Sequence, residues 1–245
     1  MLQSMTARLP SRSRSGDNLL LAVLLVLPMA AAAGADYIAS SYHRETGELV
    51  YTEQYRQQGQ QARVVFLDPG GEEISNKALD FSVAKFLPSI DFTNLSSGDQ
   101  WYIHPTADEI AMGYKKAGEE KWSEGTSDHD RPSVFDAGYP TFLQASRELL
   151  LADKKVAFYS PIPFIKRSFK MQARLSFDEE CPLDPQQYHC IKMGAANVLL
   201  RLASPAIYMS FTPHEFQLKA YSGPTNTAIG DEQRFYVRTL YNYSP

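Results

Sequence analysis

The stretch DYIASSYHRETGELVYTEQYRQQGQQARVVFLDPGGEEISNKALDFS, residues 36–82, gives the clearest indication of the fold class of this chain. Apolar and polar residues alternate along it in short runs, which is the two-residue period of a half-buried β-strand. Turn residues separate the runs, at Thr46-Gly47, Gly59-Gln60 and Asp68-Pro69-Gly70-Gly71. We therefore predict four strands, over residues 36–44, 48–57, 62–67 and 73–82. Because their connections are so short, each strand should pair with the one before it in an antiparallel meander.

The rest of the chain continues this β pattern. Residues 215–221 alternate strictly, and residues 206–211 and 234–243 are further predicted strands. Residues 110–116 and 120–125, around Ala117-Gly118, are further hairpin material, and residues 123–132 are the most loop-like part of the chain. We predict a mainly β (α+β) protein with about ten strands, in one long curved antiparallel sheet or half-barrel with one or two covering helices.

One segment has a helical period. In PTFLQASRELLLAD, residues 140–153, Phe142, Ala145, Leu149 and Ala152 share one helical face, which Leu143 and Leu150 widen. This pattern predicts an amphipathic helix that covers the concave apolar face of the sheet. The apolar segment 197–203 is either a second helix or a strand.

The N-terminal residues are typical of a secretory signal. Basic residues precede an apolar run over residues 19–33, which is shorter than the roughly 20 residues of a membrane-spanning helix. Ala33-Gly34-Ala35 fits signal-peptidase cleavage after Ala35, so we predict a cleaved signal peptide over residues 1–35 and one domain over residues 36–245. The expected location is the periplasm, and an uncleaved membrane anchor is the alternative.

The two cysteines of the chain, Cys181 and Cys190, lie in CPLDPQQYHC. In an oxidising compartment they are most simply interpreted as one disulfide that closes a short polar loop. A redox pair would normally show the C-x-x-C spacing, and a zinc site would need more ligands than His189 adds.

Charge and motifs narrow the function. The net charge of −4, which becomes more acidic once three arginines and one aspartate leave with residues 1–35, argues against nucleic-acid binding. The five histidines lack metal-site spacings, and no nucleophile elbow, Walker loop or dinucleotide motif is present, so we expect neither a metal nor a cofactor. A catalytic triad of distant residues remains an alternative.

Several segments together resemble a known group of proteins. These are YHRETGELVYTE, FLDPGGEEISNKALDFS, DAGYPTFLQASRELLLADKKVAFYSP and SPAIYMSFTPHEFQLKAYSGPTNTAIGDEQRFYVRTLY, spread over most of residues 42–241. The arrangement looks like a family of exported proteobacterial proteins of uncharacterised function, which implies no activity. In topology alone, the predicted sheet with a covering helix is distantly similar to periplasmic lipoprotein carriers of the LolA and LolB type. That resemblance implies a half-barrel with an apolar cavity under a helical lid.

These observations favour a soluble periplasmic binding or carrier protein for an apolar, lipid-like ligand held between the sheet and the helix. The candidate cavity residues are Phe142, Leu143, Leu149, Leu150, Tyr221 and Asn226. Asn226 is either a polar contact at the mouth of the cavity or simply part of the turn around Gly223. Two alternatives stay open. One is an envelope hydrolase with a dispersed active site, and the other is an interaction module that offers an exposed strand edge, near residues 234–243, to an envelope protein partner.

Overall fold

The structure is a computed structural model that describes residues 36–203, 205–225, 227 and 235–244. The predicted signal peptide and Asn226 lie outside the described residues. Cleavage after Ala35 therefore stays a prediction.

In the described residues, fourteen strands form one antiparallel sheet, which confirms the predicted mainly β class and the curved antiparallel sheet. There are more strands than the ten or so expected. The first eight are β1 (Tyr37–His43), β2 (Leu49–Gln58), β3 (Gln61–Leu67), β4 (Glu73–Asp80), β5 (Ser89–Asn94), β6 (Gln100–Pro105), β7 (Glu109–Lys115) and β8 (Ser123–Asp128). The remaining six are β9 (Val156–Ile162), β10 (Arg167–Ser176), β11 (His189–Ala195), β12 (Ile207–Phe211), β13 (Leu218–Pro224) and β14 (Tyr236–Tyr243).

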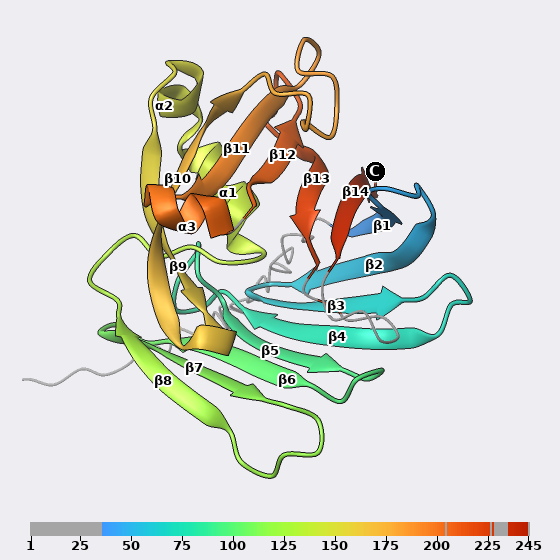
Figure 1. The fold of residues 1–245 in the computed structure, drawn as a ribbon, viewed down its shortest axis with the longest axis vertical. Helices are drawn as coiled ribbons and strands as arrows, with labels where there is room; N and C mark the ends of the chain where they lie inside the picture. Colours follow the sequence, from blue (N-terminus) through green and yellow to red (C-terminus); the bar gives the residue numbers. More distant parts are fainter. Residues whose placement is uncertain (1–35, 204, 226, 228–234, 245) are drawn as a thin grey trace, which may run out of the picture. The chain divides into compact units, whose positions relative to one another are not determined.

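The strand order is two meanders joined at the middle of the sheet. It runs β8-β7-β6-β5-β4-β3-β2-β1-β14-β13-β12-β11-β10-β9, so the last strand pairs with the first (Figure 1). Strand β14 has hydrogen-bonded neighbours on both sides, β1 and β13. The expectation of an exposed strand edge near residues 234–243 is therefore wrong, and β8 and β9 are the terminal strands of the sheet.

The two ends of this sheet approach each other. The ammonium group of Lys166, just before β10, donates to the hydroxyl of Ser123 in β8 at 2.7 Å. The segment after β8 also pairs with β9, because Val134 donates its N–H to the carbonyl of Tyr159 and Tyr159 donates to that of Pro132, both at 2.8 Å. The sheet is thus curled until it is nearly closed, and its inward face surrounds an interior.

Turn residues set the first hairpins as predicted. Gly47 and Gly59 have φ values of 75° and 62°, a left-handed region that residues with a Cβ rarely adopt. Gly59 and Gln60 form the whole connection between β2 and β3, where Gln58 pairs directly with Gln61. One predicted loop is instead a strand, because residues 123–128 form β8. Its side chains are mostly exposed, so apolar alternation could not reveal it.

The predicted helix over residues 140–153 is two shorter helices, α1 (Gly138–Ala145) and α2 (Arg147–Leu151). They are separated at Ser146, whose φ of −95° and ψ of 6° depart from helical values. The segment 197–203, left open between helix and strand, contains α3 (Val198–Ala203), and a short 3-10 helix, η1 (Pro163–Ile165), joins β9 to β10.

Helix α1 packs on the inward side of the sheet. The ring of Phe142 lies 5.2 Å from that of Phe158 in β9, measured between centroids, and 5.6 Å from that of Phe86. Gly138 begins the helix directly against the backbone of Phe86, where a Cβ would overlap the carbonyl oxygen. Arg147, the first residue of α2, donates to the carbonyls of Pro213 and His214 at 3.0 and 2.8 Å. These contacts hold α1 at the wall of the interior.

Candidate ligand-binding cavity

The interior of the sheet contains a cavity of about 760 Å³. Inward side chains from both meanders and the first turn of α1 line it. Tyrosine is prominent among them, at Tyr37, Tyr51, Tyr55, Tyr114, Tyr139, Tyr221, Tyr241 and Tyr243. An aromatic wall with scattered polar groups is typical of sites for small organic molecules.

The alternation of β2 explains how the sequence builds this wall. Every second residue of YTEQYRQ points inward, so Tyr51, Glu53, Tyr55 and Gln57 line the cavity while the residues between them face outward. The register then places Glu53 opposite Ala39 in β1, and Ala39 opposite Tyr241 in β14. Ala39, which is fully buried, has only a methyl group and separates Glu53 from Tyr241 in this row of the sheet.

The next row of the sheet is an aromatic cluster. The ring of Tyr37 stacks on that of Tyr55 with centroids 4.8 Å apart and an interplanar angle of 7°. The same ring meets Tyr241 and Tyr243 edge-on, at 5.2 and 5.6 Å between centroids. Such contacts fix the rings and leave an ordered aromatic surface beside Glu53.

Several of the polar groups in the wall have partners within the protein. The hydroxyl of Tyr139 lies 2.8 Å from that of Ser160, and the hydroxyl of Tyr221 donates to the carbonyl of Pro224 at 2.7 Å. The hydroxyl of Tyr55 donates to the amide oxygen of Gln57 at 2.8 Å. These groups are positioned by the fold and are engaged without a ligand.

Two opposite charges in the wall form a buried ion pair. The ammonium group of Lys77 in β4 donates to a carboxylate oxygen of Asp136 at 2.6 Å, and the side chains are 8% and 9% exposed. The other carboxylate oxygen of Asp136 accepts from the backbone N–H of Ala137 at 2.8 Å. The ammonium group also lies 5.3 Å from the centroid of the Phe66 ring. The positive charge of Lys77 is therefore already matched.

Glu53 differs from the other carboxylates of the wall. Among the residues that the structure describes, none forms a hydrogen bond or an ion pair with its carboxylate. Burial raises the pKa of Glu53 to about 7; the nearby Lys77 opposes this rise and Asp136 adds to it. The accessible part of this side chain faces the cavity. Glu53 is thus an unpaired acid that exchanges its proton near neutral pH.

The tyrosines around Glu53 stay uncharged. Burial raises the pKa of Tyr37, Tyr51 and Tyr241 far above its ordinary value, and the negative charge of Glu53 is the second cause in each case. Their hydroxyls therefore remain neutral. Those of Tyr37 and Tyr241 have no hydrogen-bond partner in the described part of the chain.

The structure places the sequence-predicted residues in different settings. Tyr221 lines the cavity, whereas Phe142, Leu143 and Leu150 are buried in the core around α1 and α2. The side chain of Leu149 is 47% exposed. Ligand contact by these residues, and by the undescribed Asn226, stays a prediction. Sequence reasoning missed Glu53, Tyr37 and Tyr241, although the alternation of β1, β2 and β14 could have assigned them to one face.

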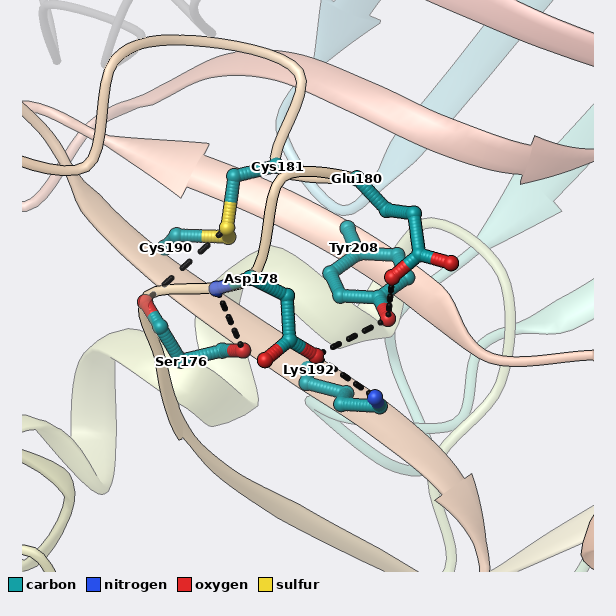
Figure 2. A network of polar contacts seen from close by, with 7 residues as sticks. All are labelled: Ser176, Asp178, Glu180, Cys181, Cys190, Lys192 and Tyr208. Atoms are coloured by element: carbon teal, nitrogen blue, oxygen red, sulfur yellow. Dashed lines mark hydrogen bonds and ion pairs between the residues drawn. A yellow bond between two sulfur atoms is a disulfide. The ribbon is translucent and has the colours of Figure 1, made fainter.

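The predicted disulfide between Cys181 and Cys190 is present, and neither cysteine lines the cavity. It joins the loop after β10 to β11, beside a polar network shown in Figure 2. There the ammonium group of Lys192 donates to Asp178 at 2.6 Å and holds the pKa of that carboxyl below its ordinary value. The hydroxyl of Tyr208 lies between the carboxylates of Asp178 and Glu180, at 3.1 and 2.8 Å (Figure 2). This cluster anchors the loop.

The described residues show neither a metal site nor a membrane-spanning helix. No group of three or more histidine, cysteine, aspartate or glutamate side chains there is arranged to hold a metal ion. Nor does that part of the chain contain a helix long and apolar enough to cross a membrane. No protein-family model matches the chain, and a search of curated proteins finds no match either. The nearly closed sheet is compatible with a lipid-carrier-like fold.

Proposed function

We propose that this chain is a binding or carrier protein that holds an apolar, lipid-like small molecule in the cavity between the sheet and α1. The observation that supports it is the cavity itself, whose volume of about 760 Å³ lies in the usual range of about 300–1,000 Å³ for ligand pockets. Its apolar lining includes Phe92, Trp101, Phe135, Phe164, Met171 and Met209. Methionine adapts its shape readily, which suits a flexible alkyl chain.

Export to the periplasm is part of the same proposal. The disulfide supports it, because disulfides persist in oxidising compartments. A carrier in that compartment would shield an apolar molecule from water. An envelope protein partner that receives the ligand is a further element of this proposal, and the terminal strand β8 is the sheet edge from which pairing with such a partner could start.

A second candidate function is an envelope hydrolase. It is favoured by Glu53, since a carboxyl group with a pKa of about 7 suits general acid–base chemistry. The nucleophile is the weak point, because no histidine of the described residues lines the cavity to activate a serine. Turnover of a panel of ester and glycoside substrates, abolished by Glu53→Gln, would favour this candidate over a carrier.

Titration with diphenylhexatriene, an uncharged apolar fluorophore, tests the carrier proposal. We expect saturable fluorescence enhancement with one site per chain. Ala195→Trp should weaken binding by at least about tenfold, because Ala195 lines the cavity and an indole there fills part of it. Ala78→Trp is the matched control, since Ala78 is exposed on β4. Absence of saturable binding, or equal binding by both variants, would overturn the proposal.

A further inference from the structure

The charged groups that line the cavity are unevenly distributed. Those of the described residues are three acids, Glu53, Asp99 and Asp136, and one base, Lys77. Lys77 is paired with Asp136 at 2.6 Å. Asp99 accepts hydrogen bonds from the hydroxyl of Tyr114 and the backbone N–H of Ala117, both at 2.9 Å. Among the acids of the described lining, Glu53 is therefore the one whose carboxylate has neither an ion pair nor a hydrogen bond within the described residues.

The surroundings of Glu53 are aromatic. Tyr51 precedes Glu53 by two residues on the same face of β2, and Tyr37 and Tyr241 line the same cavity from β1 and β14. In the sheet, Glu53 lies one row from the stacked rings of Tyr37 and Tyr55, and two strands from Tyr241. A cation at this place is attracted by the charge of the carboxylate and also by the negative faces of the tyrosine rings.

We propose that the ligand of this cavity is an amphipathic amine, whose ammonium group pairs with Glu53 among the tyrosines while its apolar body fills the rest of the cavity. This inference rests on the proposed carrier function and names the chemical class of its ligand. An ammonium group also supplies the hydrogen-bond donors that a carboxylate accepts, and the carboxylate of Glu53 has no such donor within the described residues.

The same wall disfavours a fatty acid. A ligand carboxylate near Glu53 and Asp136 would meet like charges, and the single ammonium group of the lining is already held by Asp136. A neutral alcohol is neither attracted by the charge of Glu53, as an ammonium group is, nor repelled by it, as a carboxylate is. Ligands with identical alkyl chains should therefore bind in the order amine, alcohol, carboxylate.

Displacement of diphenylhexatriene at pH 8 by dodecylamine, dodecanol and lauric acid tests this order. We expect dodecylamine to bind at least about tenfold more tightly than dodecanol, and lauric acid more weakly than dodecanol. In Glu53→Gln the advantage of the amine should disappear, so that amine and alcohol differ by less than about threefold. Glu72→Gln makes the same change at an exposed turn residue and should retain the wild-type order.

The outcomes separate the two proposals. Binding of dodecanol without a preference for the amine, or a preference that survives in Glu53→Gln, overturns the amine inference and leaves the carrier function standing. Failure of all three compounds and of diphenylhexatriene overturns both. Binding of dodecanol by Glu53→Gln also shows that this variant has folded, so a lost amine preference in it supports the inference.

Discussion

The ammonium group of Lys77 in β4 lies 2.6 Å from a carboxylate oxygen of Asp136, although the two residues are 59 positions apart in the chain. This pair is buried in the cavity wall, where an unmatched charge is costly. It ties the first meander to the segment that leads into α1. It also removes the only ammonium group of the described lining from the set available to a ligand.

Breaking this pair should destabilise the fold. Lys77→Met leaves the charge of Asp136 without its partner, and we expect the free energy of unfolding to fall by about 3–5 kcal/mol. The double variant Lys77→Met with Asp136→Asn removes both charges and should recover at least about half of the loss. Urea unfolding measures all three proteins. A double variant no more stable than Lys77→Met would show that the ion pair is not the cause.

Glu53 should make stability depend on pH. Its pKa rises from 4.5 to about 7 on folding, so between these values the folded chain binds the proton more tightly than the unfolded chain. The contribution of Glu53 to the free energy of unfolding is therefore largest below pH 4.5, falls as pH rises through this window, and levels off above pH 7. The change is on the order of 3 kcal/mol. Glu53→Gln removes it, so the stability of this variant relative to wild type should increase with pH. A difference that is constant from pH 4.5 to 8 would contradict the buried setting of Glu53.

The disulfide should stabilise the fold without shaping the cavity. Cys181→Ala with Cys190→Ala opens a loop with a sequence separation of 9 residues, and we expect a loss of about 2.5 kcal/mol in the free energy of unfolding. Binding of diphenylhexatriene should be unchanged, because neither cysteine lines the cavity. Loss of probe binding by the folded variant would place the disulfide in the binding site instead.

Gly138 should tolerate no side chain. An alanine there would overlap the carbonyl oxygen of Phe86, so α1 or the backbone near Phe86 must move. We expect Gly138→Ala to lower the free energy of unfolding by about 1–3 kcal/mol. Gly194→Ala is the control, because a Cβ at Gly194 meets no atom within 4 Å, and its effect should stay within about 0.5 kcal/mol. Equal effects of the two substitutions would refute the close approach of α1.

The sequence predicted the local elements better than their assembly. Alternation and turn glycines gave β2 and β3 to within one residue, because each strand there has one buried face. The hairpin partner predicted over residues 120–125 lies instead over residues 123–128 as β8, because a terminal strand with polar, mostly exposed side chains has no buried face to mark its bounds. The apolar period of residues 140–153 predicts one continuous helix through Ser146, because the period does not change there. The backbone at Ser146 nevertheless leaves the helical conformation and separates α1 from α2.

The site required information that local patterns do not contain. Alternation assigns Glu53 to the same face as Tyr51 and Tyr55, and this much could be predicted. That Tyr241 lies across Ala39 from Glu53 depends on the pairing of β1 with β14, which are nearly the whole domain apart in sequence. The match between Lys77 and Asp136 is likewise a tertiary contact. The unpaired state of Glu53 therefore emerged only with the fold.

Native mass spectrometry of the protein, purified from the cells that produce it without any delipidation step, tests whether the cavity carries an amphipathic amine. We expect a one-to-one complex that releases an amphipathic amine on denaturation, and this complex should be depleted in Ala195→Trp but retained in Ala78→Trp. A spectrum containing the bare polypeptide alone, or a bound mass equally abundant in both variants, would contradict this expectation.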